Sequence, residues 1–238
     1  MNFSNKRVFI TGASRGIGSK IAAKFRSEGA FIIGTRTCSE SKCETVLDQW
    51  YDADFSDEQQ IVNCAKWLSN QEIDVLINNA GINTNASFQD IDLEVFKKIQ
   101  QVNLLAPFLL SQAVIEGMCS QNWGRIVNIS SIWGKISMGG RAAYSASKFA
   151  LDGLTVALAA EHSKNGIMAN CIAPGFIDTT LTRRMLSNKQ IKNLTAQVPV
   201  GRLGEANEIA DLVLWLSSKE NTFVTGQNIS IDGGFTRV

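Results

Sequence analysis

Residues 8–18 read VFITGASRGIG and contain the features that decide the fold. The residues VFIT are apolar and rich in β-branched side chains, as expected of a buried strand. Glycines follow at positions 12, 16 and 18, and a helical pattern runs from residue 17 to residue 28. Glycine lets a backbone approach a phosphate closely, and a helix N-terminus offers it N–H groups. The stretch therefore predicts a strand, a nucleotide-binding turn and a helix, although its spacing differs from G-x-G-x-x-G.

The same alternation of strand and helix continues along the chain. Near-continuous apolar runs predict strands covered on both faces, at residues 8–11, 31–35, 74–78, 125–130, 167–173 and 228–231, with a weaker one at 49–53. Helical periodicity separates them at residues 17–28, 58–69, 94–118, 144–163 and 205–217. We therefore expect an α/β fold: one Rossmann-like domain spanning residues 1–238, with a doubly wound parallel sheet and helices on both faces.

Composition excludes several classes of protein. The 238 residues carry a net charge of +1, so no basic field favours nucleic acid or an anionic membrane. The longest strongly apolar run, residues 104–110, is too short to span a bilayer, and we expect no signal peptide because the strand-like run begins within a few residues of Met1. Five scattered cysteines and the single His162 form no metal-ligand pattern. We expect a cytoplasmic protein without a bound metal.

The end of the second strand predicts the cofactor. NAD-binding proteins commonly place an acid there, whereas a 2′-phosphate needs arginine. Here the sequence is GTRT at residues 34–37, with Arg36 and no acid before Glu40, and Arg15 lies in the glycine turn. Two guanidinium groups favour NADP(H), with NAD(H) still possible. The alternative is that both are ordinary surface arginines.

The motif YSASK at residues 144–148 places Tyr144 and Lys148 on one helix face. A free tyrosine titrates near ~10, too high for ready proton exchange at neutral pH. An adjacent ammonium and an oxidised nicotinamide would both lower its pKa. The small residues between them would leave room for the nicotinamide.

Six features together resemble the short-chain dehydrogenase/reductase family over essentially the whole chain. They are TGASRGIG (11–18), NNAG (78–81), Asn103, Ser131, YSASK (144–148) and PGFIDT (174–179). The resemblance implies that Tyr144 is the general acid, that Lys148 binds the nicotinamide ribose and lowers the tyrosine pKa, that Ser131 bonds the substrate oxygen, and that Asn103 helps to hold a water in a proton relay.

The resemblance also implies a set of cofactor contacts. Asp54 would meet the adenine amino group, although a local capping role is the alternative. Ile177 and Thr179 would meet the nicotinamide carboxamide. The full expected set is Gly12, Ser14, Arg15, Gly16, Ile17, Gly18, Arg36, Asp54, Asn79, Ala80, Gly81, Tyr144, Lys148, Pro174, Gly175, Ile177 and Thr179.

Within the family, the stretches ITGASRGIG, APGFIDT, QVPVGRLGEANEIA and VTGQNISIDGG most resemble 3-oxoacyl-[acyl-carrier-protein] reductases. Those enzymes dock an acidic carrier protein through two basic positions, which here correspond to the neutral Asn122 and Asn165. Lost charge weakens electrostatic docking, although Lys164 could compensate for part of it. A carrier-linked, sugar-derived, CoA-linked or other small ketone therefore remains open as substrate.

The sequence also bears on an anionic substrate, the oligomeric state and a non-enzymatic alternative. The basic residues Arg183, Arg184, Lys189 and Lys192 could meet an anionic substrate tail or form a solvated helix face. Paired apolar helices in relatives imply a homotetramer. A non-catalytic NADP-sensing protein is the remote alternative to an enzyme, because the Ser/Tyr/Lys set is intact.

Overall fold

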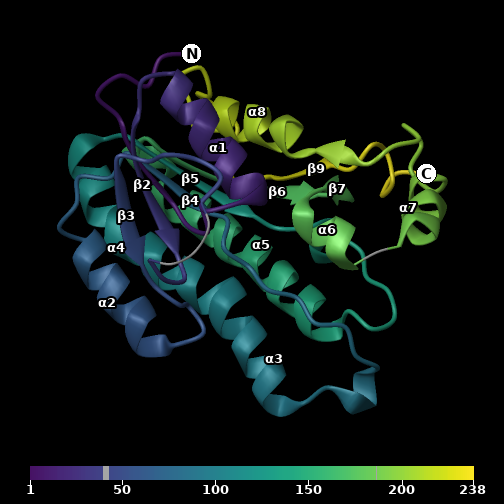
Figure 1. Ribbon diagram of the computed structural model, residues 1–238. Helices are drawn as coiled ribbons and strands as arrows, with labels where there is room; N and C mark the ends of the chain where they lie inside the picture. Colours follow the sequence, from purple (N-terminus) through teal and green to yellow (C-terminus); the bar gives the residue numbers. More distant parts are fainter. Residues whose placement is uncertain (40–42, 186) are drawn as a thin grey trace.

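Seven parallel strands form one sheet in the order β3-β2-β1-β4-β5-β6-β9 in the computed structural model, which describes residues 1–39, 43–185 and 187–238 (Figure 1). Glu40 lies outside the described residues. The strands are β1 (Arg7–Ile10), β2 (Phe31–Arg36), β3 (Gln49–Asp52), β4 (Val75–Asn78), β5 (Gly124–Ile129), β6 (Ile167–Pro174) and β9 (Asn228–Ile231). Because the strand order reverses between β1 and β4, the ligand-binding crevice of an open α/β sheet is expected at the carboxyl ends of these two strands.

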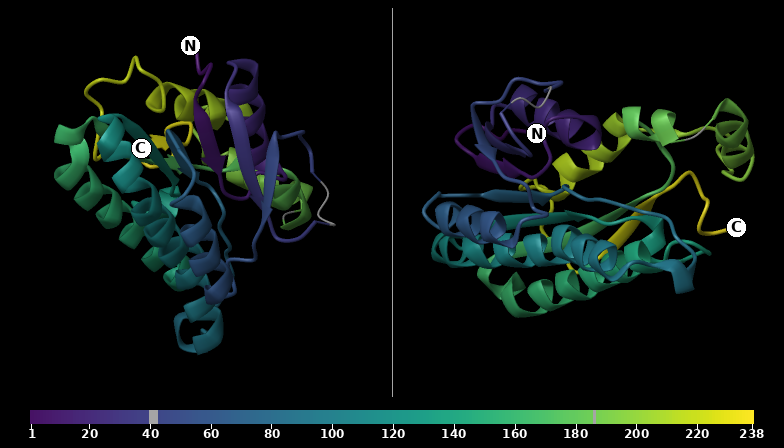
Figure 2. Two further views of the ribbon diagram at one scale, coloured as in Figure 1. Left: turned by 90° about the vertical axis from the view of Figure 1, so that its left-hand side faces the viewer. Right: turned by 60° about the horizontal axis from the view of Figure 1, so that its bottom comes forward.

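Helices cover both faces of the sheet. α1 (Gly16–Ser27) and α8 (Ala206–Leu216) lie together on one face, while α2 (Glu58–Leu68), α4 (Ala106–Gln121) and α5 (Ala142–His162) cover the other (Figures 1 and 2). Strand side chains alternate between the two cores: Val8 and Ile10 point to the α1 face, and Phe9 points to the α2 face. The strands are apolar throughout because helices bury their side chains on both faces of the sheet. The predicted doubly wound fold is confirmed.

The connection from β2 to β3 differs from the others. In its described part, residues 37–39 and 43–48, the backbone forms no helix. Leu47, only 8% exposed, instead packs into the α1-side core. The part of the molecule beside the end of β2 is therefore shaped by a loop.

The predicted long helix at residues 94–118 is interrupted. α3 (Leu93–Gln100) leads into a π-helical turn, η2 (Gln101–Leu105), before α4 begins. Pro107 in the first turn of α4 has no N–H to donate four residues back to the carbonyl of Asn103, so a regular α-helix cannot continue there. The stretch Leu93–Gln121 is long and apolar enough to cross a membrane by length and composition, but Leu110 and Met118 belong to the core.

The sequence did not predict the segment between β6 and α8. It contains β7 (Ile177–Asp178), α6 (Thr180–Met185), α7 (Asn188–Thr195) and β8 (Gly204–Glu205), with β7 and β8 paired in a separate two-stranded sheet. α6 and α7 lie at one end of the molecule (Figures 1 and 2).

Candidate active site

The glycine turn packs directly on the chain that leaves β4. Gly12 has φ +63°, and a side chain there would come within 3.1 Å of the Ala80 Cα. A side chain on Gly18 would lie 2.3 Å from the carbonyl oxygen of Gly12. The Asn79 amide donates to the carbonyls of Thr11 (2.9 Å) and Gly12 (3.1 Å). Asn79, expected to contact a cofactor, therefore uses its side chain to hold the turn.

The N-terminus of α1 carries a carboxylate from the β2–β3 loop. Glu44 Oε2 accepts from the Gly16 N–H (3.0 Å) and from the Ser19 hydroxyl (2.9 Å), and the Glu44 N–H donates to the Ser14 carbonyl (2.7 Å). A helix N-terminus attracts negative charge, so this pairing is favourable. It also places an acid beside the phosphate-binding turn that the sequence predicted.

The two arginines of the expected 2′-phosphate site lie in different surroundings. Arg36 donates from Nε to Asp52 (2.6 Å) and stacks over the Trp50 ring, 5.1 Å from its centroid. This pairing raises the pKa of Arg36. Arg15, the residue before α1, is exposed and has no carboxylate partner among the described residues. Asp54 accepts from the Ser56 N–H (2.9 Å), as a local turn residue does.

Tyr144, Lys148 and Ser131 meet at the carboxyl ends of β4 and β5. The buried Lys148 ammonium donates to the Ile129 carbonyl (2.7 Å) and lies 5.7 Å from the centroid of the Tyr144 ring. A side chain on Gly81 would sit 3.6 Å from Lys148 Nζ, so the NNAG segment borders the same crevice. Ser131, at the end of β5, is buried and accepts from the Trp133 N–H (3.2 Å).

The pKa values of this group depart from the expectation. Burial lowers the pKa of Lys148 to about 8. Burial also raises the pKa of Tyr144, against opposing effects of a hydrogen bond with Ser131 and of the Arg141 charge. Without cofactor the pKa of Tyr144 is raised, because removal of the hydroxyl from water outweighs the nearby charges. That Lys148 and an oxidised nicotinamide together lower it stays a prediction.

Asn103 joins the elements around the crevice. It lies in the π-helical turn η2, a feature often found at functional sites, and is 1% exposed. Its amide accepts from the Ile82 N–H (2.8 Å) and donates to the Ile82 carbonyl (2.9 Å) and the Ser147 hydroxyl (3.1 Å). Ser145 and Ser147 are themselves buried, so these small residues of YSASK let α5 pack closely against its neighbours. That the small residues also leave room for the nicotinamide stays a prediction.

The PGFIDT segment (174–179) approaches the glycine turn at Gly16. A side chain on Gly16 would lie 4.0 Å from Thr179 Cγ2, so this segment and the turn approach each other. The Thr179 hydroxyl accepts from the Thr182 N–H (3.3 Å) at the start of α6, and Ile177 is buried in the α1-side core. Pro174 ends β6, and Gly175 follows it against the backbone of Asp232.

The sequence analysis overlooked a polar network beneath the crevice. Asn78 on β4 donates to Asn128 on β5 (2.8 Å), and Asn128 donates to Thr155 on α5 (2.8 Å). All three residues are buried, so the pairing fixes the strands and α5 relative to one another. An asparagine inside each of the apolar strands DVLIN and RIVNIS could have indicated this buried hydrogen-bond network.

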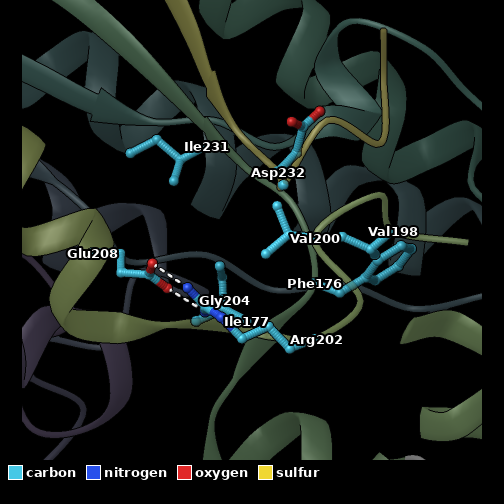
Figure 3. Close-up of a pocket in the computed structure, with 10 residues that line it drawn as sticks. Phe176, Ile177, Val198, Val200, Arg202, Gly204, Glu208, Ile231 and Asp232 are labelled. Carbon is cyan, nitrogen blue, oxygen red and sulfur yellow. Dashed lines mark hydrogen bonds and ion pairs between the residues drawn. The ribbon is translucent and has the colours of Figure 1, made fainter. Parts of the chain in front are cut away.

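Two hollows lie outside the crevice. One of about 480 Å³ opens between Ser87–Gln89 and the residues before α5, with Ser137, Met138, Gly140 and Ala142 in its wall. The other measures only about 50 Å³ and is lined by Phe176, Val198 and Ile231 among others (Figure 3). Arg202 and Glu208 pair across its edge (2.8 Å), which satisfies both charges. In residues 1–39, 43–185 and 187–238, no group of three or more His, Cys, Asp or Glu side chains could hold a metal ion.

The expected docking positions and the basic cluster can also be located. Asn122 ends α4 in the left-handed conformation (φ 50°), and a side chain on Gly166, next to Asn165, would overlap its carbonyl. The two neutral positions are therefore neighbours. Arg183 pairs with Asp178 (2.5 Å), and Lys189 and Lys192 are exposed on α7. The Arg184 side chain lies outside the described residues.

Comparison with known proteins agrees with this geometry. Residues 12–236 match the family model described as "Enoyl-(Acyl carrier protein) reductase". The chain is 39% identical to 3-oxoacyl-[acyl-carrier-protein] reductase FabG of Escherichia coli (strain K12), covering 100% of both chains, and 37% identical to that of Vibrio cholerae, covering 98% of both. Its structure resembles a gluconate 5-dehydrogenase from Burkholderia cenocepacia J2315 in complex with NADP and tartrate, with a TM-score of 0.91 and 29% identity over 100% of this chain and 97% of that one. The chain therefore belongs to the short-chain dehydrogenase/reductase family of oxidoreductases.

Proposed function

We propose that the protein, acting as a single domain in the cytoplasm, reduces a ketone to a secondary alcohol with NADPH. One observation carries the proposal: a buried ammonium, a phenol ring and a serine hydroxyl meet beside the NNAG segment, where open α/β sheets bind ligands. Gly12 and Gly18 leave no space for a side chain, and a turn of bare backbone lets the phosphates of a dinucleotide approach closely.

Each polar residue of the crevice then has a chemical role. NADPH, when bound, supplies the hydride. Tyr144 donates the proton to the carbonyl oxygen, and Ser131 holds that oxygen by a hydrogen bond. Lys148 binds the nicotinamide ribose and places positive charge beside the tyrosine. Asn103 holds the chain that follows β4, at Ile82, against Ser147 of α5. It also helps to hold the water of a proton relay.

The cofactor contacts that the family resemblance implies are proposed for the same crevice. We propose that NADPH is preferred over NADH and that Arg15 supplies most of the preference, since Arg36 is already paired with Asp52. The turn residues Gly12, Ser14, Gly16, Ile17 and Gly18 would meet the pyrophosphate, with the backbone of Asn79, Ala80 and Gly81 beside them. Asp54 would contact the adenine, and Pro174, Gly175, Ile177 and Thr179 would contact the nicotinamide. NADP in the solved relative supports this choice.

Two substrate classes are proposed. A 3-oxoacyl thioester is the first, because the curated relatives are 3-oxoacyl-[acyl-carrier-protein] reductases. A small ketone without a carrier is the second, favoured by the neutral neighbours Asn122 and Asn165 at the expected docking positions. The solved gluconate 5-dehydrogenase makes a sugar-derived ketone a specific form of the second class.

The test is NADPH oxidation with a panel of ketones, followed by the loss of nicotinamide absorbance. The panel contains a 3-oxoacyl carrier-protein thioester, the matching CoA thioester, a keto sugar acid and simple ketones. Turnover of any member supports the reductase. Tight NADPH binding without turnover of any member would instead favour a non-catalytic NADP sensor.

We also propose a homotetramer. The outer faces of α4 and α5 expose the apolar side chains of Phe108, Phe149 and Val156, which suits pairing between copies of the chain. Light scattering at micromolar concentration tests this. A mass equal to one chain would contradict it.

A further inference from the structure

Arg141 is an arginine beside the proposed proton donor that the reaction described above does not use. It is the residue before α5, three positions ahead of Tyr144, so its side chain lies within one helical turn of the phenol. Its charge acts on the Tyr144 hydroxyl and opposes the rise that burial causes in the pKa of that group. Arg141 therefore lies close to where the substrate carbonyl would bind.

Packing holds this guanidinium in place. Its central carbon lies 5.6 Å from the centroid of the Trp133 ring, and the backbone N–H of Trp133 donates to the Ser131 hydroxyl. A guanidinium stacked on an indole keeps its N–H groups free at the edge for a planar anion. The same short segment thus positions Ser131 and Arg141.

Four other arginines of the described chain are held by carboxylates or backbone carbonyls. Arg36 pairs with Asp52, Arg183 with Asp178 and Arg202 with Glu208. Arg125, which is more deeply buried, donates to four backbone carbonyls. Arg141 is half-buried, and no carboxylate lies within ion-pair distance of it among the described residues. Burial lowers the pKa of Arg141, and the nearby Tyr144 opposes this shift.

Space for a ligand lies next to this arginine. Gly140 and Ala142, its two chain neighbours, line the hollow of about 480 Å³, within the size range of small-molecule sites. Ser87, Gln89 and Ser137 add polar groups to the wall, and the Ala86 N–H donates to the Gly140 carbonyl (3.3 Å) across its edge. The residues on either side of Arg141 in the chain therefore border this hollow.

We propose that Arg141 binds a carboxylate of the substrate, so that the ketone is a keto acid whose carboxylate lies a short chain of atoms from the carbonyl. This rests on the proposed function, which it deepens by naming the substrate class. A guanidinium recognises a carboxylate through two parallel hydrogen bonds, and it takes no covalent part in the reaction. Arg183, one of the basic residues that the sequence suggested for an anionic tail, is less suited because Asp178 already neutralises it.

The experiment compares keto acids with neutral analogues that carry the same carbonyl. The pairs are 4-oxopentanoate with its methyl ester, 3-oxobutanoate with its methyl ester, and 5-oxogluconate with sorbose. For Arg141→Gln we expect kcat/KM on a reactive keto acid to fall about 10- to 100-fold, mainly through KM, because a charge-assisted hydrogen-bond pair is lost. We expect less than threefold change on the neutral partner, and Arg141→Lys should recover part of the loss on the acid. Lys97→Gln removes the same charge from exposed α3 and serves as the control.

A binding measurement separates failure of this inference from failure of the proposed function. Tartrate is titrated calorimetrically into the NADP⁺ complexes of the parent protein and of Arg141→Gln. If no ketone is turned over but tartrate binding depends on Arg141, the carboxylate site stands and the reductase proposal fails. If ketones are reduced but acids and esters lose rate equally in Arg141→Gln, the carboxylate site is wrong and the reductase stands.

Discussion

The two ends of the proposed cofactor crevice differ in how their side chains are held. At the catalytic end Lys148, Asn103 and Ser131 are buried, and each is fixed by hydrogen bonds to backbone or to a buried partner. At the adenosine end Arg15 is exposed, and the Arg36–Asp52 pair and Glu44 lie on or beside the β2–β3 loop at the surface.

This contrast indicates where specificity can vary. A buried, fully bonded group tolerates few changes, because each loss leaves a donor or acceptor without a partner. Exposed charges in a loop are screened and can be rearranged at small cost. We therefore expect large effects on chemistry at the catalytic end and small effects on cofactor affinity at the adenosine end.

The largest expected effect is that of Tyr144→Phe. Loss of the proton donor should lower kcat about 10²- to 10⁴-fold, the range typical of general acid catalysis, with NADPH affinity within about twofold. Steady-state kinetics and a fluorescence titration of NADPH measure the two quantities. Tyr51→Phe, at the only other tyrosine of the chain, is the matched control because Tyr51 packs on Trp67 away from the crevice. A near-normal kcat in Tyr144→Phe would remove the tyrosine from the mechanism.

The second prediction concerns pH. Burial lowers the pKa of Lys148 to about 8, so the ammonium is present below that pH and lost above it. If the ammonium is needed, kcat/KM for ketone reduction should be flat below about pH 8 and fall roughly tenfold per unit above it. In Lys148→Arg the guanidinium stays charged, so the break should disappear although the overall rate is lower.

The same shift has a consequence for folding. Between about pH 8 and the ordinary value of 10.5 the unfolded chain holds a proton that the folded chain has released. The free energy of unfolding should therefore rise with pH across this interval, because the cost of burying the Lys148 ammonium is removed. Urea unfolding of the parent protein and of Lys148→Met across this interval measures the change in the free energy of unfolding.

For the kinetic prediction, a parent kcat/KM that does not change through pH 9 would show that the Lys148 charge is not required.

A smaller effect is expected at the arginines of the adenosine end. Arg15→Ala should raise KM for NADPH about 10-fold and leave KM for NADH nearly unchanged, because one charge-assisted contact to the 2′-phosphate is lost. Arg36→Ala should cost less, since Asp52 already holds that side chain. Initial rates with both cofactors give the comparison. The reverse ranking would mean that Arg36 leaves Asp52 when cofactor binds.

The smallest expected effect is that of Glu44→Gln. The Glu44 carboxylate accepts from the first N–H of α1, so its charge opposes an incoming phosphate. Removal of this charge should lower KM for NADPH about two- to fivefold at low ionic strength, and the difference should shrink with added salt. Asp57→Asn, at the N-cap of α2, is the control. A higher KM in Glu44→Gln would mean that the carboxylate shapes the turn.

Local patterns predicted most of the molecule. The strand runs matched β1 to β6 and β9 within a residue or two, because apolar residues covered on both faces leave a continuous signal. The long helix was wrong at one point, since helical periodicity does not register a π-helical turn that Pro107 imposes locally. The small β7–β8 sheet escaped prediction because two residues in each strand are too few to form a pattern.

The sequence by itself determined the fold class, the family and the residues of the catalytic motif, because these depend on spacings within single strands, turns and helices. Only the tertiary structure decided the surroundings of those residues: the Asn78–Asn128–Thr155 network, the buried Lys148 with its pKa of about 8, Glu44 at the start of α1, and Arg141 on Trp133. Burial and contacts between segments far apart in the chain set the charge and the partners of each group. Spacing along the chain does not record them.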